Sequence, residues 1–193
     1  GFGLAGWALT EVLKQQGKSF VVFDAKKQSS SSVATGIYNP VVLKRFTPVS
    51  QAQELMNFSI PFYANVGNGM FQHPMSIYRV FAKAAEQNKW MEALDMPALS
   101  LYMSSKLHEN DIYNIAAPHG FGEVLHTGRI DVNGLLHHAR HNLARTHSLV
   151  QEQFDYNALK ITDEGVAYKQ WTARHIVFAE GLGVKHNPWF ATL

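Results

Sequence analysis

The order of apolar and polar positions divides the beginning of the chain into a helix and a strand. Residues 7–16 place apolar side chains at the i, i+3, i+4 spacing of one helix face, and Gly17 follows as a stop signal. Residues 19–23 are then almost continuously apolar, as in a parallel strand that is buried on both faces. Asp24 ends this run. The pattern therefore predicts a helix, a stop and a fully buried strand with an acid at its end.

The same criteria predict further elements along the chain. Helices are predicted at residues 51–63, 82–94 and 132–146. Strands are predicted at residues 75–81, 99–103, 110–118, 149–154 and 175–181, with a hairpin around a turn at 163–165. We expect the first of these helices to break near Pro61. The third has an apolar face made of Leu135, Leu136, Ala139 and Leu143.

Three glycines at Gly-x-Gly-x-x-Gly spacing precede the first helix: Gly1, Gly3 and Gly6. In a dinucleotide-binding fingerprint the first glycine permits a tight turn, and the second lets backbone N–H groups approach a pyrophosphate. The third lets the helix pack closely on the strand, and Asp24 would accept a hydrogen bond from a ribose 2′-OH. A glycine triplet alone also occurs in ordinary turns. Here a helix, a stop, a strand and an acid follow it in the expected order, which favours dinucleotide binding.

Composition excludes several classes of protein. The 193 residues are 46% hydrophobic and 17% charged, as in a globular protein, and zero cysteines exclude disulfides, thiolate metal sites and a catalytic cysteine. The net charge is only +2 and no Lys/Arg cluster adds to it, which argues against nucleic acid. No apolar run approaches the roughly 20 residues of a membrane span. We expect a cytoplasmic protein without a nucleic-acid or membrane partner.

Histidines on the predicted helix at 132–146 raise the question of a metal site. His137 and His141 share a face at i, i+4 spacing, but no glutamate lies between them as in the His-Glu-x-x-His zinc motif. We therefore expect a solvated polar face here and no metal site.

Three further motifs occur in a consistent order. Residues 31–40 read Ser-x-x-Ala-x-Gly-Ile-x-Asn-Pro, residues 128–131 read Gly-Arg-Ile-Asp, and residues 179–181 read Ala-Glu-Gly. Together with the glycine fingerprint they resemble the N-terminal portion of the FAD-dependent oxidoreductases of the D-amino-acid oxidase and glycine oxidase family. The usual family motif at the third position is Ala-Thr-Gly. A carboxylate at Glu180 would be unfavourable beside a pyrophosphate unless it points away.

The resemblance implies an α/β fold: a Rossmann-like FAD/NAD(P)-binding domain with an inserted, incomplete antiparallel-β substrate domain. The FAD-binding domain would comprise residues 1–65 and 125–193, with its first strand missing, and residues 66–124 would be part of the substrate domain. In this family the catalytic residues lie mostly in a later part of the fold, so none is assigned here. We expect this 193-residue piece to bind FAD poorly and to be inactive alone.

The resemblance and the fingerprint together assign the FAD contacts. The glycine loop would bind the pyrophosphate, Asp24 the ribose and the Phe154 backbone the adenine. Ala34 and Gly36 would border the flavin, and Gly181 would allow its close approach. The full set of expected cofactor-binding residues is Gly1, Gly3, Leu4, Ala5, Gly6, Asp24, Ala34, Thr35, Gly36, Phe154, Ala179 and Gly181.

The implied activity is oxidation of a C–N bond in a small amine or amino acid, with hydride transfer to FAD. Asp24 favours an unmodified ribose, as in FAD or NAD, over the 2′-phosphate of NADP. An NAD domain would continue strand–helix–strand within about 30 residues, whereas a long mixed segment follows Arg45 here, which favours FAD. Two alternatives stay open: an NAD-dependent Rossmann dehydrogenase, and a flavin-binding or interaction protein without catalytic activity. The substrate, the electron acceptor and the oligomeric state are not predicted.

Overall fold

A computed structural model describes residues 1–109 and 115–190 of the chain. The chain divides into two compact units, which are described separately. The first unit contains residues 1–34 and the described residues from 132 onward, and the second contains residues 35–131 without the undescribed ones. The expected boundaries at 65/66 and 124/125 differ from this division. Residues 35–65 pack with the second unit, because Val41 and Phe46 share its buried apolar cluster with Phe81 and Trp90.

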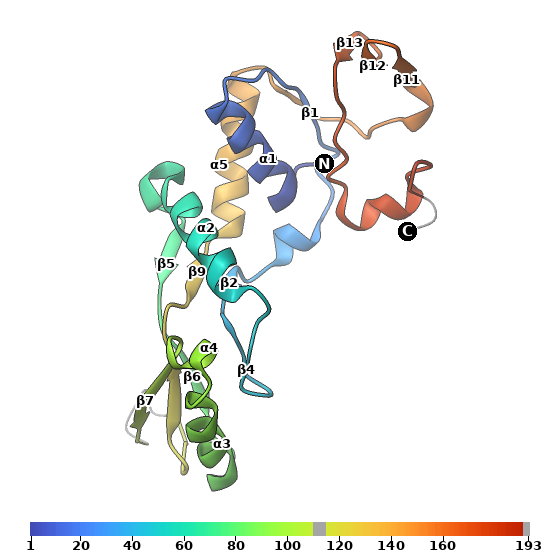
Figure 1. The fold of residues 1–193 in the computed structure, drawn as a ribbon. Coiled ribbons are helices and arrows are strands. Elements are labelled where there is room, and N and C mark those ends of the chain that lie inside the picture. The colour runs from blue at the N-terminus through green and yellow to red at the C-terminus, as the bar shows by residue number, and fades with distance from the viewer. Residues whose placement is uncertain (110–114, 191–193) are drawn as a thin grey trace. The chain divides into compact units, whose positions relative to one another are not determined.

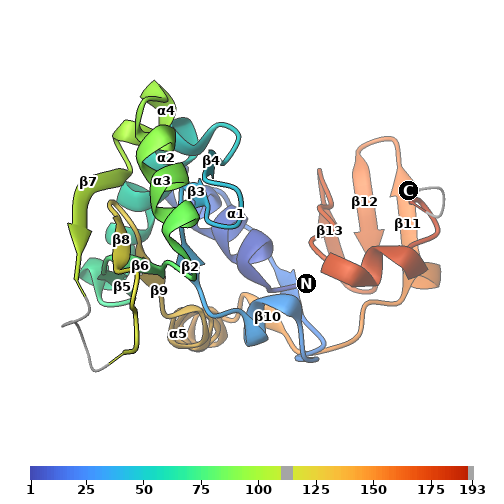
Figure 2. The same ribbon diagram turned by 90° about the horizontal axis from the view of Figure 1, so that it is seen from below.

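The first unit combines two long helices with short strands. In Figure 1 helices α1 (Leu4–Gln15) and α5 (Val132–Arg145) lie side by side. Strands β1 (Val22–Phe23) and β10 (Leu149–Val150) form a parallel pair, with Val22 opposite Leu149. The remaining elements are β11 (Leu159–Thr162), β12 (Gly165–Tyr168), β13 (Trp171–Ala173), and 3-10 helices at Ser30–Val33, Tyr156–Ala158 and Gly181–His186. Figure 2 shows β11–β12–β13 as an antiparallel sheet.

Local pattern accounts for the two helices of this unit. Helix α1 ends just before Gly17, whose φ of +63° is the left-handed conformation of a helix stop, as predicted. Helix α5 buries the predicted face of Leu135, Leu136, Ala139 and Leu143. The strand at 19–23 is present only as β1 and is half-buried rather than fully buried. Among the described residues its single hydrogen-bonded neighbour is β10, so β1 belongs to a sheet of two strands.

A parallel strand pair with a helix before its second strand is a component of Rossmann-like folds. Two short strands do not define such a fold, and the Rossmann-like assignment stays a prediction. The predicted hairpin at 161–168 is confirmed by β11 and β12, which pair from Leu159–Tyr168 to Thr162–Gly165.

The second unit is built from small antiparallel sheets and helices α2 (Ala52–Ala64), α3 (Ala84–Leu94) and α4 (Pro97–Ser100). The sheet orders are β2–β9–β5, β6–β8–β7 and the pair β3–β4. The strand bounds are β2 Ile37–Tyr38, β3 Val41–Val42, β4 Thr47–Pro48, β5 Gln72–Pro74, β6 Ile77–Val80, β7 Met103–His108, β8 Phe121–Val124 and β9 Gly128–Ile130. A 3-10 helix spans Val66–Gly69. In both Figures 1 and 2, α3 lies beside the β6–β8–β7 sheet.

The core of the second unit centres on Trp90 of α3, which is fully buried. Its ring meets Phe46 and Phe81 edge-to-face at centroid distances of 5.5 and 5.6 Å, and its Nε1 donates to the Ser104 carbonyl at 3.0 Å. A Cβ at Gly122 of β8 would overlap the same ring. Helix α3 is therefore fixed to the sheet by one large side chain.

The predicted helix at 51–63 is present as α2, but its predicted break and two predicted strands are wrong. Helix α2 continues through Pro61, and the Pro61 carbonyl accepts from the Asn65 amide at 3.1 Å. Residues 99–103 are not a strand, because Pro97 begins α4 and strand β7 starts only at Met103. Residues 175–180 have no regular structure although they are apolar, since no strand pairs with them within the described chain. The predicted irregular strand at 110–118 lies partly outside the described residues.

Candidate functional site

The glycine fingerprint forms a close-packed loop at the start of α1. A Cβ at Gly1 would overlap the Ala179 carbonyl oxygen, and a Cβ at Gly6 would overlap the Gly1 carbonyl oxygen. A Cβ at Gly6 would also lie 3.5 Å from the Cβ of Ala179. Both glycines therefore permit the backbone to pack against itself and against residues 179–180. The atoms nearest Gly6 belong to Gly1 and Ala179, which lie in no strand, so the expected packing of the helix on a strand at Gly6 stays a prediction.

The N-terminus of α1 presents backbone donors beside this loop. The Leu4 amide donates to the Ser31 hydroxyl oxygen at 3.0 Å, and the Trp7 amide donates to the Gly3 carbonyl at 2.9 Å. Within the described chain the amides of Ala5 and Gly6 have no acceptor. The first turn contains no acidic residue, and the N-cap residue is Gly3, which has no side chain to accept from the helix amides. Two amide donors at the positive end of the helix dipole are therefore left, which favours an anion.

Ser31 lies directly over Gly3, where a Cβ would come within 2.9 Å of its hydroxyl oxygen. The hydroxyl accepts from Leu4 and has no acceptor for its own proton among the described residues. It can therefore donate to a second oxygen. Sequence analysis placed Ser31 in the motif at 31–40 but did not assign it to the site. Its neighbours predict only a polar loop, and nothing local shows that the loop folds back onto Gly3.

Asp24 follows β1 and turns its carboxylate to the glycine loop. Its Oδ1 accepts from the Phe2 amide at 3.3 Å, and its own amide donates to the Val150 carbonyl of β10 at 3.0 Å. The Asp24 side chain is 13% exposed. The predicted ribose acid is thus brought beside Gly1 and Gly3, with one lone pair on each carboxylate oxygen left after its protein contacts.

Arg140 of α5 is the second partner of Asp24, and sequence analysis missed it. Its Nε donates to Asp24 Oδ2 at 3.2 Å, and its Nη2 donates to the Phe2 carbonyl at 2.9 Å. The guanidinium carbon also lies 5.5 Å from the centroid of the Phe2 ring. Asp24 and Arg140 are 116 residues apart in sequence, so no local pattern points to this pair.

Glu180, the departure from the family motif, is held by two neighbours. Tyr156 donates its hydroxyl proton to Oε1 at 2.5 Å, and Asn187 donates from Nδ2 to Oε2 at 2.8 Å. Burial, followed by the hydrogen bond and charge of Glu180, raises the pKa of Tyr156 to about 12. Gly181 begins the next 3-10 helix with φ +56°, and a Cβ added to it would meet no atom within 4 Å. A glycine is needed there for its backbone conformation.

The other predicted contacts fall in different surroundings. Phe154 is half-buried in an aromatic cluster. Its ring stacks on that of Tyr168 with the ring centroids 4.2 Å apart, and its centroid lies 5.9 Å from that of Phe23, the residue before Asp24. Ala34 is exposed and follows the 3-10 helix that carries Ser31. Thr35 and Gly36 belong to the second unit, where their carbonyls accept from Arg129 and Ile130 of β9.

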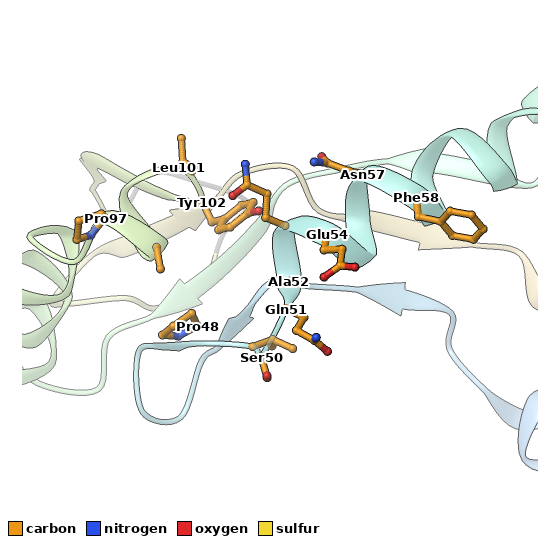
Figure 3. A pocket seen from close by; sticks show the side chains of 13 residues that line it. Pro48, Ser50, Gln51, Ala52, Glu54, Asn57, Phe58, Pro97, Leu101 and Tyr102 are labelled. Carbon is orange, nitrogen blue, oxygen red and sulfur yellow. The ribbon is translucent and has the colours of Figure 1, made fainter.

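The second unit carries an open groove of about 1020 Å³ between the start of α2 and α4. Figure 3 shows Glu54, Asn57 and Phe58 of α2 and Pro97 and Leu101 at the α4 side. Glu54 is the single charged residue among the thirteen that line it. The other polar side chains that line it are uncharged: Ser50, Gln51, Gln53, Asn57 and Tyr102.

A polar cluster also lies on the β6–β8–β7 sheet of the second unit. The Glu123 carboxylate accepts from the hydroxyls of Ser76 at 2.7 Å and Tyr78 at 3.4 Å, and it lies 3.1 Å from His108 Nε2. The Ser76 hydrogen bond is the main cause that lowers the pKa of Glu123. Because three side chains already surround the carboxylate, this cluster is best explained as a clasp between three strands.

No family model matches this chain, and no solved structure matches it. The resemblance found in the sequence therefore stays a prediction, and the candidate site rests on its geometry.

Two further features bear on the expected partners. No helix in the described ranges is long and apolar enough to cross a membrane. Within the same ranges no group of three or more His, Cys, Asp or Glu side chains is arranged to hold a metal ion. His137 and His141 lie exposed on α5.

Proposed function

We propose that the first unit binds the adenine dinucleotide of FAD on its glycine loop and that the protein is a flavin-dependent oxidoreductase. The observation that carries this proposal is the position of Asp24. Its carboxylate lies against the Phe2 amide, beside a helix N-terminus whose Ala5 and Gly6 amides have no acceptor in the described chain. Groups that suit a sugar and groups that suit a phosphate are thus adjacent.

The phosphate half of this site fits its ligand electrostatically. Free amides at a helix N-terminus and the positive end of its dipole stabilise an anion. The Ser31 hydroxyl can add a donor while it continues to accept from Leu4. Glu180 is the nearby carboxylate that would repel a phosphate, and Tyr156 and Asn187 hydrogen-bond both of its oxygens. These bonds hold the Glu180 side chain but leave its charge, so the fit to a pyrophosphate rests on the free amides and the Ser31 hydroxyl.

The ribose half fits an unmodified sugar. Each Asp24 oxygen accepts one protein hydrogen bond and has a lone pair left for a hydroxyl. A 2′-phosphate would bring a further negative charge to this carboxylate, which supports FAD or NAD over NADP.

The choice of FAD over NAD is supported by the family resemblance and by the long segment inserted between the two parts of the first unit. When bound, FAD would supply the chemistry by accepting a hydride from a C–N bond of an amine or amino acid. The residues of this chain would hold the phosphates and the ribose. The described contacts assign no proton-transfer group.

Ligand titration tests this proposal. FAD, NAD⁺, NADP⁺ and ADP are titrated separately into the chain to millimolar concentration, and binding is followed by calorimetry and by quenching of flavin fluorescence. We expect FAD and ADP to bind and NADP⁺ to bind least well. Binding of NAD⁺ but not FAD would favour the dehydrogenase alternative, and no binding of any adenine nucleotide would refute the proposal.

A matched pair of variants localises the binding. Ser31→Ala removes the hydroxyl beside Gly3, whereas Ser30→Ala changes an exposed serine on the same 3-10 helix. Loss of one hydrogen bond to a charged phosphate should weaken FAD binding roughly tenfold in Ser31→Ala only. An equal effect of the two variants would contradict binding at the glycine loop.

The substrate class needs a separate test on the full-length protein. FAD-loaded protein is incubated anaerobically with amines, amino acids and hydroxy acids, and bleaching of the yellow flavin absorbance is recorded. Bleaching by an amine or amino acid supports C–N oxidation. Bound FAD that no compound reduces would instead support the binding-protein alternative.

A further inference from the structure

We infer that Arg140 is a positioning residue that fixes Asp24 and the glycine loop in the geometry needed to recognise a ribose 2′-OH. This inference rests on the proposed function of the loop. Arg140 belongs to α5, which follows the inserted second unit in the chain, whereas Asp24 and Phe2 precede that insertion. The side chain thus joins the two sequence segments of the first unit at its candidate site.

The contacts form a closed ring between three residues. Arg140 donates through Nε to Asp24 Oδ2 and through Nη2 to the Phe2 carbonyl. The Phe2 amide in turn donates to Asp24 Oδ1. Rotation of the carboxylate or movement of the loop would break at least one of these bonds. The carboxylate plane and the peptide of Phe2 are therefore set together.

Partial burial makes this arrangement more than a surface ion pair. The side chains of Arg140 and Asp24 are 24% and 13% exposed, so solvent screens them less than a fully exposed pair. The planar fork of a guanidinium can donate to a carboxylate and a carbonyl at once, which a single ammonium does with poorer geometry. Arginine is therefore specifically suited to this position.

If Arg140 acts by orienting Asp24, its loss should have an effect on ligand preference that the loss of a merely stabilising residue would not have. If Arg140 orients the carboxylate toward the ribose, its loss should remove the preference for a 2′-OH. If Arg140 only stabilises the unit, or contacts a phosphate directly, its loss should weaken ligands with and without that hydroxyl equally. ADP and 2′-deoxy-ADP differ by this single group and serve as the probes.

The experiment measures the affinity of both probes for the full chain by calorimetry. The unsubstituted chain should bind ADP roughly tenfold more tightly than 2′-deoxy-ADP, the effect of one hydrogen bond to a charged acceptor. Arg140→Gln should reduce this ratio to about one, and Arg140→Lys should give an intermediate ratio. Arg145→Gln, an exposed arginine on the last turn of the same helix, should leave it unchanged.

A double variant completes the test. Asp24→Ala, which removes the acceptor, should itself abolish the discrimination, and Arg140→Gln should then have no further effect on the ratio. A ratio that persists in Arg140→Gln would overturn the inference while leaving the proposed function intact. An unsubstituted chain that binds neither ADP nor FAD would instead overturn the proposed function. If Arg140→Gln does not fold, Arg140→Lys decides: an unchanged ratio in that variant overturns the positioning role.

Discussion

The core of the second unit and the candidate site of the first unit are built from different kinds of contact. The second unit has a buried apolar cluster around Trp90, to which β3, α3, α4, β7 and β8 contribute. At the candidate site of the first unit, the corresponding contacts are polar and involve the backbone. Ser31, Asp24 and Arg140 each bond to a main-chain group between Phe2 and Leu4.

This difference separates stability from recognition. An apolar core is stabilised by area removed from water and is insensitive to the exact direction of each contact. A loop held by directed hydrogen bonds has a defined shape but gains little net free energy from each bond. We therefore expect core substitutions to act mainly on the free energy of unfolding, and loop substitutions to act mainly on ligand affinity.

The largest effect is expected in the core of the second unit. Trp90→Ala removes a fully buried ring and should lower the free energy of unfolding by about 3–5 kcal/mol. Urea denaturation measures this loss. Trp189→Ala, at a site that is 46% exposed, is the matched control and should cost much less. Similar losses in both variants would contradict a core centred on Trp90.

A smaller loss of stability with a loss of binding is expected at Gly6. In Gly6→Ala the new methyl group would overlap the Gly1 carbonyl, and relief of this overlap should cost about 1–3 kcal/mol and displace the loop. Urea denaturation and FAD titration give the two readouts. Gln15→Ala at the exposed far end of α1 is the control. Unchanged FAD affinity in Gly6→Ala would argue against the loop as the binding site.

The Glu123 clasp gives the second unit an acid dependence. Hydrogen bonds lower the pKa of Glu123 in the folded state. Its contribution to the free energy of unfolding is therefore present above the ordinary glutamate pKa and is lost as pH falls through the lowered pKa. Glu123→Gln should cost about 1 kcal/mol at neutral pH and flatten the acid limb of the stability curve. Urea midpoints between neutral and acid pH test this, and parallel curves for the two proteins would contradict it.

Tyr156 gives the first unit a dependence at the opposite end of the pH scale. The pKa of Tyr156 in the folded state is raised to about 12. The contribution of the Tyr156–Glu180 hydrogen bond to the free energy of unfolding is therefore present below the ordinary tyrosine pKa and is lost as pH rises through about 12. Tyr156→Phe should cost about 0.5–1 kcal/mol at neutral pH and make the alkaline loss of stability shallower. Thermal unfolding at neutral and alkaline pH provides the comparison. An alkaline limb as steep as that of the unsubstituted chain would contradict the assignment.

Local pattern explains which parts of the fold could be predicted. Helix α5 and the β11–β12 hairpin follow from periodicity and turn residues, and the buried face of α5 is the one predicted. Pro61 and residues 175–180 show the limit. Whether a proline breaks a helix, or an apolar run becomes a strand, depends on neighbours that no local window contains.

The candidate site divides in the same way. Gly1, Gly3, Gly6 and Asp24 could be selected because their spacing within one short segment has a known physical purpose. Ser31 belonged to a recognised motif, but its approach to Leu4 depends on how a polar loop folds back. Arg140 could not be found, because the contact with Asp24 exists only after α5 packs beside α1.

The most direct test of dinucleotide binding by the first unit is amide chemical-shift mapping, which detects weak binding as well as strong. ¹⁵N-labelled chain is titrated with FAD, and the shifts of all assigned amides are followed. The structure predicts that the largest changes fall on Leu4 to Trp7, Asp24 and Ser31, and that Trp90 and its neighbours in the second-unit core stay unchanged. Saturating FAD that leaves the amides of the glycine loop unshifted would contradict the account.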